Sequence, residues 1–229
     1  MKVSLIILTL NEIVGLREIF PQIPLSSVDE VLAIDGGSTD GTIEFFRSAN
    51  IPVHIQTVRG RGEAFRLAFE KGSGDALIFF SPDGNENPAD IPRFRPFLEK
   101  GYDIVIANRM SNGGHNEEDI HILKFRKWAN NGFTLAANLT WNRDSYVYDT
   151  INGYRAITRP AWERLSPDGP GYTIEYQSSI RAFKHKLRIA EFPTAEGQRV
   201  DNRIGSPSVQ TGIAFVKMYF RELFTTSAL

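Results

Sequence analysis

The sequence of 229 residues contains no cysteine, which excludes disulfide bonds and thiolate metal sites and fits a reducing compartment. Histidines are few and scattered, at positions 54, 115, 121 and 185, and their spacing is not that of a zinc site. No G-x-G-x-x-G motif follows the first apolar run, so the dinucleotide-binding signature is also missing. These absences exclude several common kinds of cofactor site.

Long hydrophobic runs and an excess of charge are missing as well. No apolar run approaches the ~20 residues that span a bilayer, and Val3–Leu8 is too short for the apolar core of a signal peptide. The net charge is −1, so no global field attracts nucleic acid. We therefore expect a cytoplasmic protein with no nucleic-acid partner.

What is present is the pattern of an α/β protein. The length fits one α/β domain, or one such domain with an extension. Apolar runs that predict buried strands alternate with helical patterns up to residue 107, which indicates a mostly parallel sheet flanked by helices. The predicted strands are Val3–Leu8, Glu30–Asp35, Val53–Val58, Ala76–Phe80 and Asp103–Ala107.

The pattern changes after Arg109, where we expect a C-terminal extension. Helical patterns cover residues 88–99, 117–141, 173–185 and 209–224. Strand-like pieces lie near Tyr146–Tyr148, at Gly153–Ile157 and at Leu187–Phe192. A polar loop is predicted over residues 194–208.

The most informative segment is 79–88, where the fourth apolar run ends in Ser-Pro-Asp-Gly-Asn-Glu-Asn-Pro. Ligands of open α/β sheets bind at the carboxyl ends of strands. The oxygen ligands of Asp83 and its neighbours suit Mg²⁺ or Mn²⁺, and such an ion suits a diphosphate. The alternative is a plain connection, with Asn87 capping a helix that begins at Pro88.

Two other strand ends carry candidate ligand loops. Asp35 can accept hydrogen bonds from a base or a ribose, and the two glycines after it allow close approach. The same segment is compatible with a tight turn and a helix cap. Gly60-Arg61-Gly62 follows the third run and alone is a weak indication of phosphate binding.

In their order, these segments resemble the family 2 glycosyltransferases, and within them the polyprenyl-phosphate (dolichyl-phosphate) mannose and glucose synthases. The resemblance extends over nearly the whole chain. It implies a GT-A fold, a Rossmann-like domain that binds a nucleotide-diphosphate sugar and a divalent metal. The matching segments are Leu8–Glu12, Asp35–Thr42, Gly60–Ala64, Gly74-Asp75, Ser81–Asn85, Ala107–Arg109, Asp149–Arg155 and Gly171–Glu175.

The resemblance also implies how the chain is divided and which residues hold the donor. It suggests one domain over residues 1–229, with a nucleotide-sugar-binding half over 1–108 and an acceptor-side half over 109–229. Asp83 takes the place of the second aspartate of the family's D-x-D motif, as a metal ligand and catalytic residue assisted by Asn85. The implied donor-binding residues are Thr9, Asn11, Glu12, Asp35, Gly60, Asp83 and Arg203, the last in a loop that closes over the diphosphate.

On the acceptor side, Arg109 lies where the polyprenyl synthases place an arginine for the acceptor phosphate. Arg126 is implied as a second phosphate ligand, and Asn130, one helical turn later, as a hydrogen-bond donor. Asp149 matches an active-site acid of many inverting relatives and is the candidate base for a hydroxyl acceptor. Without the resemblance, a solvated surface or a helix ion pair is the more common role of such arginines, and a turn cap is the more common role of an aspartate such as Asp149.

Ser81 is the departure from the family pattern, because it replaces the first aspartate of D-x-D. A serine hydroxyl is a poorer metal ligand than a carboxylate, so we expect weak binding of Mg²⁺ or Mn²⁺ by Asp83 and the diphosphate together. A metal-independent or catalytically silent relative is the alternative.

The resemblance implies an inverting glycosyltransferase that moves a sugar from a nucleotide-diphosphate sugar to a polyprenyl phosphate. A transferase acting on a sugar hydroxyl of a cell-surface glycan and a silent nucleotide-sugar-binding module stay open as alternatives. A lipid acceptor requires contact with a bilayer, and residues 209–224 have the pattern of an interfacial helix. We therefore expect peripheral contact at the inner face of the membrane. Packing of this helix on its own domain or in a homo-oligomer is the alternative.

Overall fold

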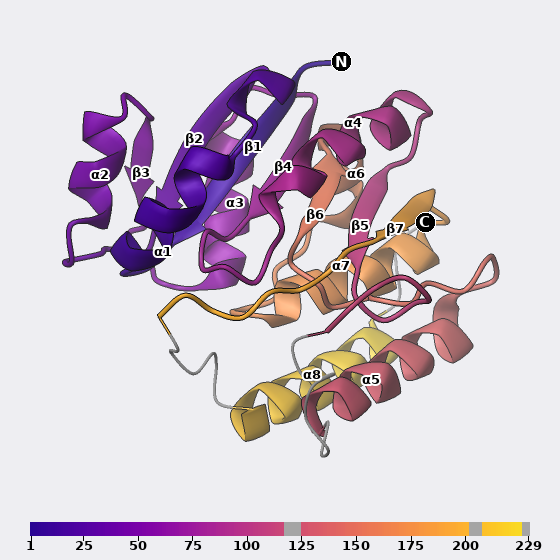
Figure 1. The fold of residues 1–229 in the computed structure, drawn as a ribbon. Coiled ribbons are helices and arrows are strands. Elements are labelled where there is room, and N and C mark those ends of the chain that lie inside the picture. Colours follow the sequence, from indigo (N-terminus) through magenta and orange to yellow (C-terminus); the bar gives the residue numbers. More distant parts are fainter. Residues whose placement is uncertain (117–124, 202–207, 226–229) are drawn as a thin grey trace.

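The computed structural model describes residues 1–116, 125–201 and 208–225, without the side chains of residues 125, 126 and 208. The described strands form one sheet in the order β3-β2-β1-β4-β6-β5-β7 (Figure 1). β6 runs antiparallel to both neighbours, and the other pairs are parallel. The strands are β1 Val3–Thr9, β2 Glu30–Asp35, β3 Val53–Ile55, β4 Ala76–Phe80, β5 Ile104–Asn108, β6 Arg155–Thr158 and β7 Ile189–Pro193.

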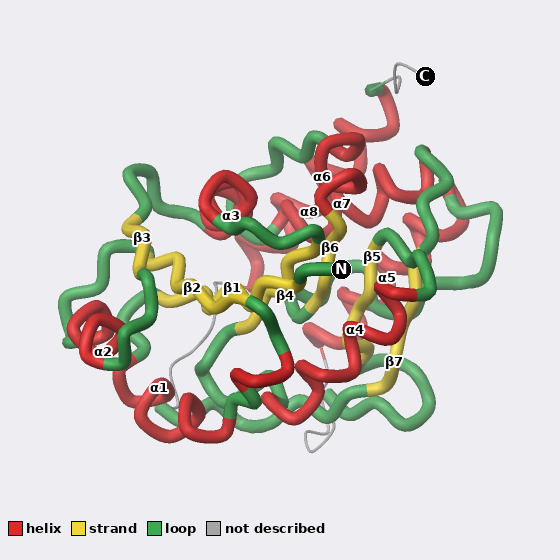
Figure 2. Tube along the Cα trace, turned by 90° about the horizontal axis from the view of Figure 1, so that it is seen from above, coloured by secondary structure: helices red, strands yellow, loops and turns green. Residues whose placement is uncertain are grey.

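Helices cover both faces of this sheet (Figure 2), and short 3₁₀ turns lie in some of the connections between helices and strands. The α-helices are α1 Ile13–Ile19, α2 Thr42–Ser48, α3 Arg61–Lys71, α4 Ile91–Glu99, α5 Phe125–Trp141, α6 Arg159–Leu165, α7 Thr173–Lys184 and α8 Ser208–Phe224. The 3₁₀ turns are η1 Phe20–Gln22, η2 Leu25–Ser27 and η3 Pro88–Asp90.

The sequence of β1 shows why the sheet is covered on both sides. All of its residues are buried, as expected for a strand between two helix layers. Ile6 and Leu8 belong to the core shared with α3, α6 and α7, whereas Leu5 and Ile7 belong to the core shared with α1, α2 and α4. The period-two alternation of a strand thus supplies apolar side chains to two cores.

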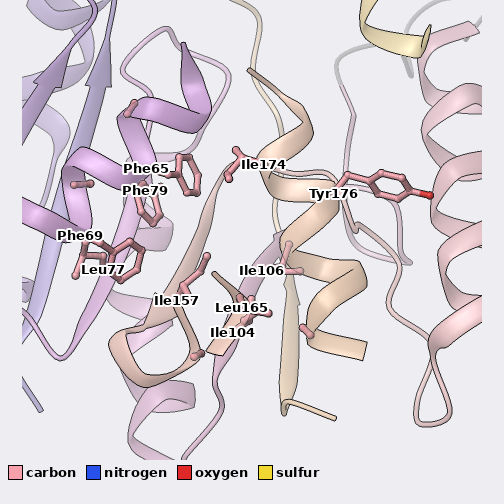
Figure 3. Close-up of a cluster of buried hydrophobic side chains, with 14 of the residues drawn as sticks. Phe65, Phe69, Leu77, Phe79, Ile104, Ile106, Ile157, Leu165, Ile174 and Tyr176 are labelled. Atoms are coloured by element: carbon pink, nitrogen blue, oxygen red, sulfur yellow. The ribbon is translucent and has the colours of Figure 1, made fainter. Parts of the chain in front are cut away.

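Aromatic stacking fixes α3 on the sheet. The rings of Phe65 and Phe79 lie nearly parallel, with centroids 3.7 Å apart (Figure 3). Burial of one such ring stabilises the fold by about 1.5–3 kcal/mol. Tyr176 of α7 ends the same cluster, and its hydroxyl donates to the carbonyl of Phe133 at 2.8 Å. These contacts place the first turn of α3 and the α5 helix at the carboxyl ends of the strands.

The part of the chain after residue 109 is built into the same sheet. β6 lies between β4 and β5, and β7 extends the edge beyond β5. Helices α5 and α8 lie side by side across the carboxyl ends of the strands (Figure 1). Phe215 of α8 packs against Phe133 of α5, with ring centroids 5.3 Å apart.

Most of the predicted elements are confirmed, but the strand near Tyr146–Tyr148 is wrong. Both tyrosines are exposed, and the residues form no strand. The backbone of buried Val147 is satisfied by the side chain of Asn138, whose amide donates to its carbonyl at 2.8 Å and accepts its N–H at 3.0 Å. The side-chain amide of Asn138 therefore makes the two backbone hydrogen bonds that a neighbouring strand would otherwise provide.

The helix predicted from Pro88 begins as the 3₁₀ turn η3, and Asn87 caps it by accepting the N–H of Ala89 at 3.1 Å. The predicted third strand ends early, at Ile55. The first part of the helix predicted over 117–141, residues 117–124, lies outside the described residues.

Candidate functional site

A cavity of about 730 Å³ lies at the carboxyl ends of the strands. Leu8 and Thr9 of β1 line it together with Ile34 of β2, and Phe133 of α5 and Phe215 of α8 form part of its wall. Because β2 and β4 pair with opposite sides of β1, this is the switch point at which open α/β sheets bind ligands.

Asp35 organises the loop after β2. Its Oδ1 accepts the backbone N–H groups of Gly37 and Ser38, and its Oδ2 accepts the hydroxyls of Thr9 and Ser38, all at 2.6–2.8 Å. These four hydrogen bonds fill the acceptor positions of the carboxylate. Asp35 itself is fully buried, and the neighbouring Gly36 faces the cavity. In this structure Asp35 therefore shapes the loop that a donor nucleotide would contact.

The other predicted donor residues lie near this loop. Glu12 and Gly60 line the cavity, and the Gly60 carbonyl accepts a hydrogen bond from Gln56 at 2.8 Å. Asn11 is not among the lining residues. Its backbone N–H donates to the Ser38 hydroxyl at 2.7 Å, so it joins the two loops instead.

Asp83 lies on the cavity wall and is nearly buried. Burial has the larger effect and raises the pKa of Asp83 above its ordinary value. The Arg199 guanidinium, 2.9 Å from Oδ2 of Asp83, acts in the opposite direction. Oδ1 accepts the backbone N–H of Asn85 at 3.0 Å. The side-chain amide of Asn85 donates to the carbonyl of Gly197 at 2.8 Å, so this amide ties two loops together.

The oxygen atoms around Asp83 suit a hard cation that is shared with a ligand. Ser81, Asp83, Asn85 and Glu86 all line the cavity. Within residues 1–116, 125–201 and 208–225, no group of three or more histidine or acidic side chains is arranged to bind a metal ion by itself. Mg²⁺ is commonly held by one or two carboxylates plus substrate phosphates, and this donor set fits that arrangement.

Sequence reasoning assigned no role to Glu86, although it lies in the informative segment. Its carboxylate accepts the backbone N–H of Ser81 at 2.7 Å. Burial, opposed by the charge of Arg61 and assisted by that of Asp83, raises the pKa of Glu86 to about 8. Glu86 is therefore largely neutral near neutral pH, and Asp83 is the carboxylate more available to a cation.

An ion pair between Arg61 and Glu175 was also missed, although both residues lie in segments that carry the family resemblance. Arg61 Nε donates to Glu175 Oε1, and Arg61 Nη1 lies 3.4 Å from the Ser81 hydroxyl. Burial opposes the charge of Arg61, but Glu175 and Glu86 together raise its pKa above the ordinary value. The guanidinium stays charged and links α7 to the segment after β4.

Arg109 is one of the two arginines that the family resemblance implied for the acceptor phosphate, and it lines the cavity. Its Nε and Nη2 donate to the two carboxylate oxygens of Asp149 at 2.8 and 3.1 Å, and its Nη1 donates to Glu196 at 3.0 Å. Burial opposes its charge, but the two acids raise the pKa of Arg109. Asp149 is fully buried and is not among the lining residues, so its geometry is that of a residue that orients Arg109.

The remaining predicted acceptor residues lie on α5 or outside the described chain. Asn130 lines the cavity. Arg126 lies in the first turn of α5, one turn before Asn130, but its side chain is not described. Arg203 lies outside the described residues.

With this geometry in view, comparison with known proteins decides the family. The sequence model of glycosyl transferase family 2 matches residues 4–224. The chain belongs to glycosyl transferase family 2. This confirms the resemblance found in the sequence and identifies the chain as a glycosyltransferase.

Two relatives of this glycosyltransferase are informative. Glycosyltransferase AglJ of Haloferax volcanii is 27% identical over 222 residues, which cover 93% of this chain and 69% of AglJ. The undecaprenyl-phosphate mannosyltransferase of Micrococcus luteus is 29% identical over 233 residues, which cover 93% of this chain and 89% of that enzyme.

A solved structure supports the fold of the glycosyltransferase. Glucosyl-3-phosphoglycerate synthase of Mycobacterium tuberculosis, in complex with Mn²⁺, UDP-glucose and glycerol 3-phosphate, superposes with a TM-score of 0.74 at 20% identity. The match covers 99% of this chain and 82% of the synthase. The predicted GT-A type of fold, a mostly parallel sheet flanked by helices, is confirmed.

Proposed function

We propose that this glycosyltransferase moves a sugar, with inversion, from a nucleotide-diphosphate sugar to a polyprenyl phosphate. The observation that carries the proposal is that one cavity is lined both by Asp83, at the carboxyl end of β4, and by the buried, charged Arg109. The name of the Micrococcus luteus relative supports a polyprenyl phosphate as the acceptor.

The arrangement suits a phosphate acceptor better than a hydroxyl acceptor. A phosphate is ionised near neutral pH and needs positioning rather than a base. An arginine offers a bidentate fork for that purpose, and Arg109 is held in place by Asp149. In this proposal Arg126 and Asn130 complete the acceptor site from α5. Asp149 would have to leave Arg109 before it could act as a base for a hydroxyl.

On the donor side, Thr9, Glu12 and Gly60 contact the nucleotide, while Asn11 and Asp35 shape its loops. Asp83, with Asn85 and the Ser81 hydroxyl beside it, would hold Mg²⁺ or Mn²⁺ jointly with the diphosphate. When bound, such an ion would neutralise the charge that develops on the departing diphosphate. Arg203 is proposed to close over the same group. The halves 1–108 and 109–229 then divide donor and acceptor binding within one domain.

The acceptor needs access from a lipid surface, and α8 supplies an apolar one. No helix in the described part of the chain is long and apolar enough to cross a bilayer. Exposed apolar side chains nevertheless form a stripe along α8 that begins at Val209, which is 76% exposed and also lines the cavity. The other members of the stripe are Ile213, Val216, Phe220, Leu223 and Phe224. Helix α5 also has exposed apolar side chains, at Trp128, Leu135 and Leu139.

We propose that this stripe lies on the inner face of the membrane and that the polyprenyl chain reaches the cavity past Val209. Continuity of the apolar stripe with the cavity favours a lipid over a second copy of the chain. Contact of this kind is peripheral, and Lys217 on the same helix would add attraction to anionic lipids, about 1 kcal/mol per basic residue. Arg221, also on α8, forms an ion pair with Asp168 and would contribute less.

A donor and acceptor screen tests the proposed function. The protein is incubated with a panel of nucleotide sugars and a short polyprenyl phosphate, with Mg²⁺ or Mn²⁺ and with a chelator, and glycolipid is measured. Formation of a sugar-phosphate lipid is expected. Transfer to a glycan hydroxyl alone would show that the acceptor is a glycan rather than a polyprenyl phosphate. Binding of nucleotide sugar without transfer to either acceptor would favour a catalytically silent nucleotide-sugar-binding module.

A further inference from the structure

Arg155 of β6 is fully buried, and neither the sequence pattern nor the family resemblance assigned it a role. Its guanidinium donates hydrogen bonds to uncharged oxygens. Nε donates to the Asn152 carbonyl at 2.6 Å, and Nη2 donates to the Thr150 carbonyl at 3.1 Å. Nη1 donates to the Glu175 carbonyl at 3.0 Å and to the Ser179 hydroxyl at 3.1 Å. One side chain therefore joins the loop before β6 to helix α7.

Helix α7 is the fixed side of this contact, because most of its residues are buried. Ser179 of α7 is completely buried, and its hydroxyl donates to the Thr150 carbonyl at 2.7 Å. Residues 142–154, between α5 and β6, contain no helix or strand. The side chains of Arg155 and Ser179 therefore supply the hydrogen-bond partners that hold this part of the loop on α7.

The loop that Arg155 holds carries two residues that contact Arg109 or the strand end before it. Asp149 directly precedes Thr150 and accepts hydrogen bonds from Nε and Nη2 of Arg109. Asn152 lines the cavity, and its side-chain amide donates to the carbonyl of Ala107, two residues before Arg109. A continuous series of contacts therefore runs from α7 through Arg155 and the loop to the guanidinium of Arg109 in the cavity wall.

The charge of Arg155 is consistent with this arrangement. Burial lowers the pKa of Arg155 to about 10, and the negative charges of Glu175 and Asp149 oppose that change. Arg61 and Arg109, which pair with these two acids, act in the same direction as burial. The guanidinium is still a cation near neutral pH. Because a buried cation costs free energy that hydrogen bonds and nearby charges must offset, Arg155 is suited to holding polar backbone rather than to filling the core.

We propose that Arg155 is a positioning residue for the acceptor phosphate and that it acts through Asp149 and Arg109. This inference rests on the proposed function. Arg155 is not among the residues that line the cavity, so it does not touch the acceptor itself. It fixes the loop on α7, the loop fixes Asp149, and Asp149 sets the plane in which the guanidinium of Arg109 presents its donors to the phosphate. Removal of Arg155 should therefore affect the acceptor and spare the donor.

Two binding measurements on the full chain test this assignment. Calorimetry gives the affinity for farnesyl phosphate, a short polyprenyl phosphate, in the presence of UDP and Mn²⁺, and separately the affinity for UDP with Mn²⁺. The variants are Arg155→Met, Ser179→Ala, Arg109→Ala and the double variant of Arg155→Met with Arg109→Ala. The control is Phe46→Leu, at a completely buried position of α2 that is not among the cavity-lining residues. Thermal unfolding of each variant reports whether it folds.

We expect Arg155→Met to lose about tenfold or more of its affinity for farnesyl phosphate, as Arg109→Ala does, because the charge-assisted contact is no longer oriented. In the Arg109→Ala background, Arg155→Met should cause no further loss, since no guanidinium is left to orient, whereas a merely structural role would give additive losses. Ser179→Ala should show a smaller loss in the same direction, and it carries the test if the methionine variant does not fold. UDP affinity should stay at the wild-type value throughout. Phe46→Leu should lower the unfolding temperature and leave both affinities unchanged.

Wild-type affinity for farnesyl phosphate in every folded variant at positions 155 and 179 would overturn the assignment while leaving the proposed function intact. A further loss of the same size on top of Arg109→Ala would also overturn it, because Arg155 would then act independently of Arg109. Parallel loss of UDP and farnesyl phosphate affinity would overturn it as well, since that is the signature of a damaged site. Failure of the wild type to bind farnesyl phosphate at all would overturn both proposals.

Discussion

Arg109 donates to both carboxylate oxygens of Asp149, from Nε at 2.8 Å and from Nη2 at 3.1 Å, and the aspartate is completely buried. A buried acid in this position fixes the plane of the guanidinium. The third contact, from Nη1 to Glu196, comes from the loop after β7. The orientation of Arg109 in the cavity therefore depends on two acids that are distant from it in the sequence.

Asp149→Asn should impair acceptor use and stability together. Removing one partner of a buried ion pair costs about 3–5 kcal/mol, so the unfolding temperature should fall. The KM for polyprenyl phosphate should rise, while the affinity for nucleotide diphosphate stays close to that of the wild type. Steady-state kinetics, calorimetry and thermal unfolding check these outcomes. Unchanged kinetics with the acceptor would show that Asp149 does not orient Arg109 for catalysis.

Arg109→Ala and Arg126→Ala should each weaken acceptor use by about tenfold or more, because a charge-assisted contact contributes roughly 1.5–3 kcal/mol. Donor binding should change little. Rates are measured at several concentrations of polyprenyl phosphate, with Arg143→Ala as the control on an exposed arginine. Wild-type rates in both variants would favour a hydroxyl acceptor instead.

Asp83→Ala should abolish most metal-dependent binding of nucleotide diphosphate and most of the activity. Ser81→Asp should leave the fold intact and tighten metal binding, because it adds a hard charged ligand. Calorimetry with UDP, with and without Mn²⁺, compares the two variants with the wild type. If Asp83→Ala retained the metal dependence of UDP binding, the metal site would have to lie elsewhere.

Glu191 makes stability depend on pH. Burial raises the pKa of Glu191 to about 7, against the backbone N–H groups of Tyr148 and Asp149 that its oxygens accept. An acid whose pKa is higher in the folded state stabilises the fold below its unfolded pKa, and this contribution is lost as pH rises through about 7. The unfolding temperature of the wild type, compared with that of Glu191→Gln at the same pH, should therefore fall between about pH 5 and about pH 8. An offset between the two proteins that does not change with pH would contradict this.

Replacing Val216 and Phe220 by serine should reduce co-flotation with anionic liposomes without changing the affinity for UDP. Both side chains belong to the exposed stripe of α8. Val58→Ser is the control, because Val58 is also exposed but lies far from this helix in the sequence. Flotation is measured at low and high salt, and binding should weaken as salt screens the basic residues. Absence of wild-type flotation at low salt, or a dimer that the substitutions dissociate, would assign the stripe to another partner.

The fold was largely predictable from the sequence because the central strands are buried on both faces. Such strands are continuous apolar runs, as in Val3–Thr9 and Ala76–Phe80, and they can be recognised locally. The place of β6 between β4 and β5 was not predictable, because pairing between distant segments leaves no local pattern. The error at Tyr146–Tyr148 has the same origin, since the partner of Val147 is the side chain of Asn138.

The site was predictable where a motif marks the end of a strand. Asp83 and Arg109 were proposed as site residues in this way, and the structure places both on the cavity wall. The Arg61–Glu175 pair joins residues 114 positions apart, and Arg199 reaches Asp83 through backbone contacts between two loops. Such relationships depend on tertiary structure, which composition and spacing do not encode.

The insertion of β6 into the sheet limits how this enzyme can be redesigned. An acceptor-side segment exchanged with that of a relative would bring its own β6, which must pair with β4 on one side and β5 on the other. A fragment ending at residue 108 would leave the edges of β4 and β5 without their common neighbour, and unpaired edges promote aggregation. Acceptor preference is therefore better altered by grafting loops and helix surfaces at the carboxyl ends of the strands than by exchanging modules.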